Sequence, residues 1–188
     1  LIHIFAMVPS NGGRPLLISD AAVNISPDVE TRTEAALEMA RLLRNIGVHH
    51  PRIAVLSATE SELPAMPSSV EAALIVAAAS EVDPAAAYAG PLSFDLAVSP
   101  ESAVIKGVDG NTQIGSVAGY ADGLIVPDIV SGNVLFKSIV YFAGGLAAGL
   151  VVGGRVPIIL TSRSDPPSSR LASLVLAQLY EAEGQISF

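Results

Sequence analysis

Short apolar segments alternate with segments of helical periodicity along most of this 188-residue chain. A strand followed by a turn is expected within residues 1–15. Further strand-like segments are expected within residues 14–25 and at residues 52–56, 123–126, 150–152 and 158–160. Helical patterns cover residues 26–46, 70–80, 131–142 and 169–183. Such alternation is typical of an α/β layer fold, whose central strands are buried on both faces. The pattern therefore predicts a mixed, mainly parallel sheet flanked by helices.

Several boundaries follow from local signals. Ser26 and Pro27 predict the start of the first helix, with Ser26 as its N-cap, and Gly47 predicts its end. Residues 57–69 form a polar surface loop, and residues 80–91 are expected to be an irregular connector. Residues 91–107 contain a short helix or two, and the glycine-rich residues 107–119 form another loop.

The charge of the chain argues against a nucleic-acid binder. The net charge is −8, whereas such a protein needs a basic surface to neutralise phosphates. No Lys or Arg lies between Arg52 and Lys106, so an anionic ligand is expected to meet the C-terminal half. Cysteine is absent, which excludes a disulfide scaffold, a thiolate metal site and a cysteine nucleophile.

One uncharged segment, residues 138–154, raises the question of a membrane span. Its length lies at the lower limit of the roughly 17–25 residues that cross a bilayer. It contains G-x-x-x-G spacings, but its glycine pairs and the following Arg155 and Pro157 fit a buried helix followed by a core strand. A soluble core is therefore the preferred interpretation.

The most informative stretch is the loop at residues 161–165, between an apolar strand and the last helix. Thr161, Ser162, Arg163 and Asp165 gather hydroxyls, a guanidinium and a carboxylate where a helix N-terminus favours anions. The loop predicts a phosphate or oxyanion site. The alternative is a plain connector, because Ser, Asp and Pro are also the usual residues of helix starts.

A second polar loop follows the strand at residues 123–126. Asp128 comes just after a proline, Gly132 permits an unusual backbone turn, and Asn133 and Lys137 share one face of the following helix at i, i+4 spacing. This helix start could hold a phosphate or an acyl carbonyl. The alternative is an Asx turn at Asp128, a packing glycine and a solvated lysine.

Other polar residues give weaker signals. Asp20 and Asn24 follow an early strand, and Asp95 lies near a predicted short helix. The histidines (His3, His49 and His50) have no metal-ligand spacing, so no metal site is predicted. The sequence also lacks the G-x-S-x-G, Walker and G-x-G-x-x-G motifs.

Five segments together resemble the phosphate acetyl-/butyryltransferase family, most closely its phosphate butyryltransferase branch. In family order they are SDAAVNISPDVET (19–31), RIAVLSATE (52–60), GPLSFDLAVS (90–99), VAGYADGLIVPDIVSGNVLFK (117–137) and VPIILTSRSD (156–165). The last two are specific, and the earlier ones agree in order and spacing.

The resemblance implies the reaction acyl-CoA + phosphate ⇌ acyl phosphate + CoA, with no separate cofactor. It implies the two-lobed fold of isocitrate and isopropylmalate dehydrogenases, an active site between the lobes, a cytoplasmic homodimer, and neither nucleic-acid nor membrane partners. Residues 1–188 correspond to the C-terminal part of such a chain, with about 15–160 in one lobe and 161–188 returning to the other. An N-terminal section of the family chain, and with it part of one lobe, is expected to be missing.

Residue roles also follow from the resemblance. Ser162 and Arg163 match the family's catalytic Ser-Arg pair, and Asn133 and Lys137 match its GNxxxK motif, so Asp128, Gly132, Asn133 and Lys137 are predicted to bind substrate. Acetyltransferase members have an Asp seven residues after the Ser, where this chain has Ser169, and Asp165 is the candidate substitute as proton acceptor. Val130 and Ser131 stand where Glu-Ala is common.

Two functions remain open. The first is a phosphate acyltransferase that works by direct transfer in a cleft between lobes. The second is a non-catalytic module that binds CoA or phosphate, which the expected missing section favours.

Overall fold

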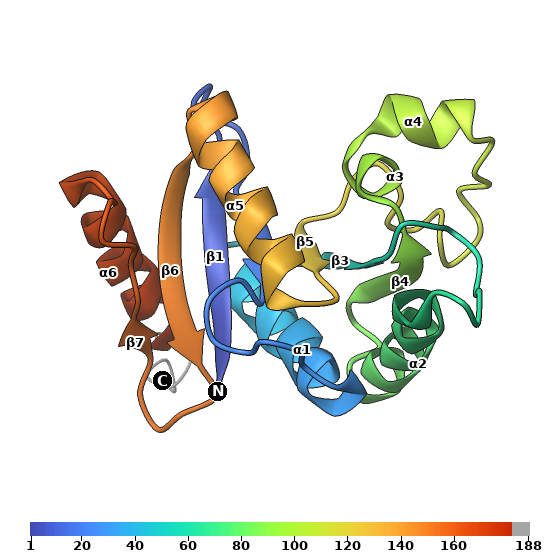
Figure 1. Cartoon of the computed structure of the whole chain (residues 1–188), viewed down its shortest axis with the longest axis horizontal. Helices are drawn as coiled ribbons and strands as arrows, with labels where there is room; N and C mark the ends of the chain where they lie inside the picture. Colours follow the sequence, from blue (N-terminus) through green and yellow to red (C-terminus); the bar gives the residue numbers. More distant parts are fainter. Residues whose placement is uncertain (182–188) are drawn as a thin grey trace.

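The computed structural model describes residues 1–181, which form one sheet with helices on both faces (Figure 1). The strands are β1 (Ile2–Val8), β2 (Leu16–Ser19), β3 (Arg52–Leu56), β4 (Ala87–Leu92), β5 (Gly123–Ile125), β6 (Leu146–Val152) and β7 (Ile158–Ile159). The helices are α1 (Val29–Asn45), α2 (Pro67–Val82), α3 (Phe94–Val98), α4 (Pro100–Ile105), α5 (Ile129–Ala143) and α6 (Pro167–Glu181). The predicted alternation of strands and helices is confirmed.

The sheet is mixed, with the strand order β4-β3-β5-β2-β1-β6-β7. The first four strands in this order are parallel, and β1 is inserted antiparallel between β2 and β6. Five strands therefore run in one direction, as the sequence predicts. Their carboxyl ends lie along one edge, where ligands collect in sheets of this type.

Two hydrophobic cores lie on opposite faces of the sheet. On one face α1, α2 and α6 bury residues such as Met39, Ile75 and Leu176. On the other face α3 and α5 bury Leu96 and Phe136. The chain thus leaves β3 toward the first face through α2, and leaves β5 toward the second face through α5. This divergence between two adjacent strands positions a cavity described below.

The first helix begins two residues later than predicted. Asp28, not Ser26, is its N-cap, and the Asp28 carboxylate accepts a hydrogen bond of 2.8 Å from the backbone N–H of Thr31. A carboxylate at this position satisfies a free N–H group and favours the positive end of the helix dipole. The end was predicted correctly, because Gly47 has the left-handed φ of 93° that terminates a helix without strain.

The prediction of an irregular connector over residues 80–91 is wrong, since it contains β4. The segment AYAGPL has a Gly and a Pro, which both weaken a strand signal. The sheet explains both residues. A Cβ on Gly90 would lie 2.8 Å from the Val55 carbonyl of β3, so only glycine fits there, and β4 is an outer strand that tolerates proline.

The uncharged segment at residues 138–154 is divided between α5 and β6. Gly144, with φ of 65°, ends α5, and β6 begins two residues later and lies between β1 and β7 in the sheet. Among residues 1–181, no helix has the length and apolar character needed to cross a membrane.

Candidate functional site

The loop at residues 161–165 connects β7 to α6 and is closed by its own carboxylate. The Ser162 N–H donates a 2.6 Å hydrogen bond to Oδ2 of Asp165, and the Asp165 N–H returns one of 3.1 Å to the Ser162 carbonyl. The Ser162 and Ser164 hydroxyls lie 3.1 Å apart. The backbone of the loop is thus held without the Ser162 side chain, which remains able to contact a ligand.

The start of α5 is organised by Asp128. Its carboxylate accepts hydrogen bonds from the N–H (2.8 Å) and the hydroxyl (3.1 Å) of Ser131, as expected of an N-cap. Gly132, one turn into the helix, is buried against β2, because a Cβ there would lie 2.5 Å from the Asp20 carbonyl. Asp128 and Gly132 therefore set the position of α5, and neither lines the cavity described next.

A cavity of about 280 Å³ brings three predicted residues together, namely Ser162, Asn133 and Lys137. It is lined by Asn133, Phe136, Lys137 and Ile129 of α5, by Leu160, Thr161 and Ser162 of the loop, and by Ala21, Ala22 and Phe5. The i, i+4 spacing on α5 thus faces the loop, as the sequence predicts. Arg163 is exposed at the adjacent position, and Asp165 lies behind Ser162.

Two positively charged side chains at this site have no carboxylate partner among residues 1–181. Within residues 1–181, Lys137 and Arg163 form no ion pair or hydrogen bond with other side chains, whereas Arg32, Arg44 and Lys106 all pair with carboxylates. A free ammonium and a free guanidinium beside a hydroxyl are suited to an anion. No group of three or more His, Cys, Asp or Glu side chains in the same residues could hold a metal ion.

The wall opposite the loop is built around Asp20, which is only 4% exposed. Its carboxylate accepts hydrogen bonds from the backbone N–H groups of His3 (3.1 Å), Ala22 (2.9 Å), Val23 (2.9 Å) and Asn24 (3.3 Å), and from Nδ2 of Asn24 (2.7 Å). This network fixes the turn after β2. The Asn133 amide then donates to the Ala21 carbonyl at 3.3 Å, which ties α5 to that turn. The sequence indicated Asp20 only as a polar residue after a strand.

The floor of the cavity is aromatic. The Phe5 and Phe136 rings stack with centroids 4.1 Å apart, and the His3 ring packs edge-on against Phe5 at 4.2 Å. His3 is fully buried, and neither ring nitrogen has a hydrogen-bond partner of normal geometry among the described residues. Burial lowers the pKa of His3 from 6.5 to about 4, against the opposing effects of the Asp20 carboxylate and the Leu160 carbonyl.

His3 should therefore make stability depend on pH. The unfolded chain protonates this imidazole near pH 6.5 and the folded chain only near pH 4, so the free energy of unfolding falls as the pH drops through this window. The loss amounts to about 3 kcal/mol at most. Urea unfolding of the wild type and of His3→Gln from pH 7.5 to 4 measures it. A variant with the same pH dependence as the wild type would contradict this assignment.

Known proteins resemble this chain along most of its length. Residues 1–177 match the family described as phosphate acetyl/butaryl transferase. The chain is 41% identical to a phosphate acetyltransferase of Rhizobium meliloti over 96% of its own length and 56% of that protein. It is 32% identical to a phosphate butyryltransferase of Clostridium acetobutylicum over 94% of its length and 58% of that protein.

Solved structures give the same result. A branched-chain phosphotransacylase from Enterococcus faecalis superposes with a TM-score of 0.84 at 37% identity, covering 95% of this chain and 64% of that one. A phosphotransacetylase from Streptococcus pyogenes superposes with a TM-score of 0.81 at 25% identity, covering 97% of this chain and 54% of that one. The chain thus spans somewhat more than half the length of these relatives.

Proposed function

The chain belongs to the phosphate acetyl/butyryltransferase family, and we propose that it transfers an acyl group between coenzyme A and inorganic phosphate. The proposed reaction is acyl-CoA + phosphate ⇌ acyl phosphate + CoA. The observation that supports it best is the cavity in which Ser162 meets Asn133 and Lys137. A hydroxyl, an amide and an ammonium group at one site can hold an anionic nucleophile and polarise a carbonyl.

In this proposal phosphate binds between the Lys137 ammonium and the Arg163 guanidinium. Both groups are without partners in the described part of the chain. Arg163 can give phosphate two parallel hydrogen bonds, while Lys137 acts as a point charge. When phosphate is held beside the thioester, the two reactants no longer have to meet by diffusion. This positioning lowers the activation barrier of acyl transfer and accounts for much of the rate acceleration.

A phosphate oxygen then attacks the thioester carbonyl carbon, a C–O bond forms, and the C–S bond breaks as the CoA thiolate leaves. The Ser162 hydroxyl donates to the carbonyl oxygen as it becomes an oxyanion, with Asn133 beside it. In the reverse direction the CoA thiol must lose a proton, and Asp165 is the proposed acceptor. Its Oδ2 is used by the Ser162 N–H, which leaves Oδ1 for the thiol.

The remaining assignments follow from the family. We propose that a second lobe completes the cleft, that the enzyme is a cytoplasmic homodimer, and that acyl transfer needs no cofactor. Within the expected second-lobe segment, α6 packs on the sheet described above through Leu176 and Tyr180, and residues 182–188 lie outside the described residues. The match covers 56% and 58% of the two relatives named above. The alternative function is a module that binds CoA or phosphate without turnover.

The test is release of CoA from acetyl-, propionyl- and butyryl-CoA with and without phosphate, followed with a thiol-reactive dye. The chain has no cysteine, so the protein gives no background. Phosphate-dependent release should fall roughly 100-fold or more in Arg163→Ala, because two charge-assisted hydrogen bonds are lost. Arg170→Ala, an exposed arginine on α6, is the matched control and should keep wild-type activity. If the folded wild type releases no CoA, the transferase function is contradicted and the alternative, a module that binds CoA or phosphate without turnover, is favoured.

A further inference from the structure

A second cavity, of about 440 Å³, lies on the other side of α5 from Asn133 and Lys137. It is enclosed by residues 56–58 after β3, by Val126 and Pro127 after β5, and by Ser131 and Leu135 of α5. The catalytic proposal uses none of these side chains. Two of the segments that resemble the family, residues 52–60 and 90–99, contribute to this cavity rather than to the first.

The position of this cavity is that of a ligand site in a doubly wound sheet. β3 and β5 are adjacent and parallel, yet the chain leaves β3 through α2 on one face and leaves β5 through α5 on the opposite face. The diverging connections open a crevice beyond the carboxyl ends of the two strands. Crevices at such switch points are where open α/β sheets bind their ligands.

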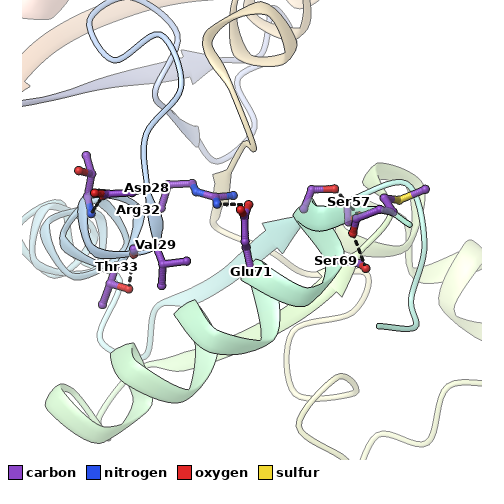
Figure 2. Close-up of polar contacts among 10 residues, drawn as sticks. Asp28, Val29, Arg32, Thr33, Ser57, Ser69 and Glu71 are labelled. Carbon is purple, nitrogen blue, oxygen red and sulfur yellow. Dashed lines mark hydrogen bonds and ion pairs between the residues drawn. The ribbon is translucent and has the colours of Figure 1, made fainter. Parts of the chain in front are cut away.

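The lining selects an uncharged ligand with hydrogen-bond donors. Among the described residues no charged side chain lines the cavity, and apolar groups such as Leu56, Val126 and Leu135 form most of it. Ser57 lies beside the first turn of α2 (Figure 2). Its hydroxyl is 3.0 Å from the hydroxyl of Ser68. Each hydroxyl has one proton and two lone pairs, so this pair retains acceptor capacity after its mutual hydrogen bond. A purely aliphatic ligand would leave these acceptors unpaired.

An aromatic ring lines part of the cavity. Phe94 is 42% exposed, and its neighbours on both sides are tied to other segments. Ser93 donates to Glu60, and Lys106 Nζ pairs with Glu60 at 2.7 Å and with Asp95 at 3.0 Å. The Lys106 ammonium accordingly lowers the pKa of Asp95 to about 2. These contacts hold the segment that carries Phe94, whose partly exposed ring offers a stacking surface at the cavity.

We propose that this cavity binds the adenine ring of acyl-CoA, which stacks on Phe94 and donates its exocyclic amino group to the serine pair. Adenine is flat, uncharged and rich in hydrogen-bonding edges, so it matches a lining of apolar groups and hydroxyl oxygens. A short acyl chain matches neither the hydroxyls nor the volume. This proposal rests on the proposed function only for the identity of the ligand, because adenosine alone tests the site.

The experiment titrates the wild-type chain with adenosine, CoA and pantetheine by calorimetry. Adenosine has no phosphate and no thiol, so its binding is independent of turnover. In Phe94→Ala the affinities for adenosine and CoA should fall about 10- to 100-fold, while that for pantetheine stays unchanged. Phe142→Ala, a 92% exposed phenylalanine near the end of α5, is the control and should bind like the wild type. Leu135→Trp should block adenosine by filling the cavity.

Three results would overturn the proposal. One is a wild type that does not bind adenosine. Another is adenosine affinity that is the same in Phe94→Ala and in the wild type. The third is a Phe94→Ala variant in which only the affinity for pantetheine falls. That result would place the pantetheine arm of CoA, not its adenine ring, in the cavity. If the chain binds adenosine but shows no phosphate-dependent CoA release, the adenine site is supported and the proposed transferase activity is contradicted.

Discussion

Ser162→Ala should lower kcat for phosphate-dependent CoA release about 100- to 1000-fold, the range seen when one donor to a developing oxyanion is removed. Ser162 lines the cavity beside Asn133 and Lys137, and its proposed role is to donate a hydrogen bond to the thioester oxygen. The loop should keep its shape, because the Ser162 N–H and carbonyl, not its side chain, make the hydrogen bonds to Asp165. The effect should therefore fall on kcat, with the KM for phosphate little changed.

Ser164→Ala is the matched control for this substitution. Ser164 is exposed in the same loop, and its hydroxyl is the one that Ser162 contacts at 3.1 Å. Its replacement removes this hydroxyl pair without removing the proposed oxyanion donor, so its kcat should stay within about threefold of the wild type. Equal losses in the two variants would show that the hydroxyl pair shapes the loop and that Ser162 has no special role.

Asp20→Asn should lower the free energy of unfolding by about 3 kcal/mol. The Asp20 carboxylate accepts five hydrogen bonds. An amide presents an NH₂ group in place of one oxygen, so it opposes N–H donors in a buried site and leaves them unpaired. Urea denaturation at pH 7.5 measures the change.

Asp28→Asn provides the comparison for Asp20→Asn. Asp28 is an exposed N-cap, and Asn caps helices about as well as Asp, so its stability should change by no more than about 0.5 kcal/mol. Asp20→Asn should also lower CoA release, because the turn that holds Ala21 and Ala22 forms a wall of the cavity. Full stability together with full activity in Asp20→Asn would show that the network is dispensable.

Periodicity and end signals predicted most of the fold. β3 was located at its observed residues, and α5 and α6 were placed within two residues of their observed starts. The errors occur where tertiary contacts outweigh local pattern. β4 escaped detection because Gly90 and Pro91 weaken its strand signal, yet the sheet requires a glycine facing the Val55 carbonyl.

The candidate site was predictable in part for the same reason. Asn133 and Lys137 share a helix face through spacing alone, and the loop at residues 161–165 is conspicuous in composition. Their meeting depends on how β1, β6 and β7 follow one another in the sheet, which no local pattern specifies. The role of Asp20 likewise depends on the backbone of His3, a neighbour that only the pairing of β1 with β2 provides.

The antiparallel insertion of β1 between β2 and β6 also affects how the protein is made. β1 pairs with β2, which is close to it in sequence, but its other partner, β6, lies about 150 residues further along the chain, where Ile2 pairs with Val152. Contacts so distant in sequence form late and slowly. During synthesis, the backbone hydrogen-bonding groups on one edge of the apolar strand IHIFAMV therefore stay unpaired until β6 has been made. A strand with an unpaired edge is prone to aggregation. The yield of folded protein then depends on how fast translation reaches β6.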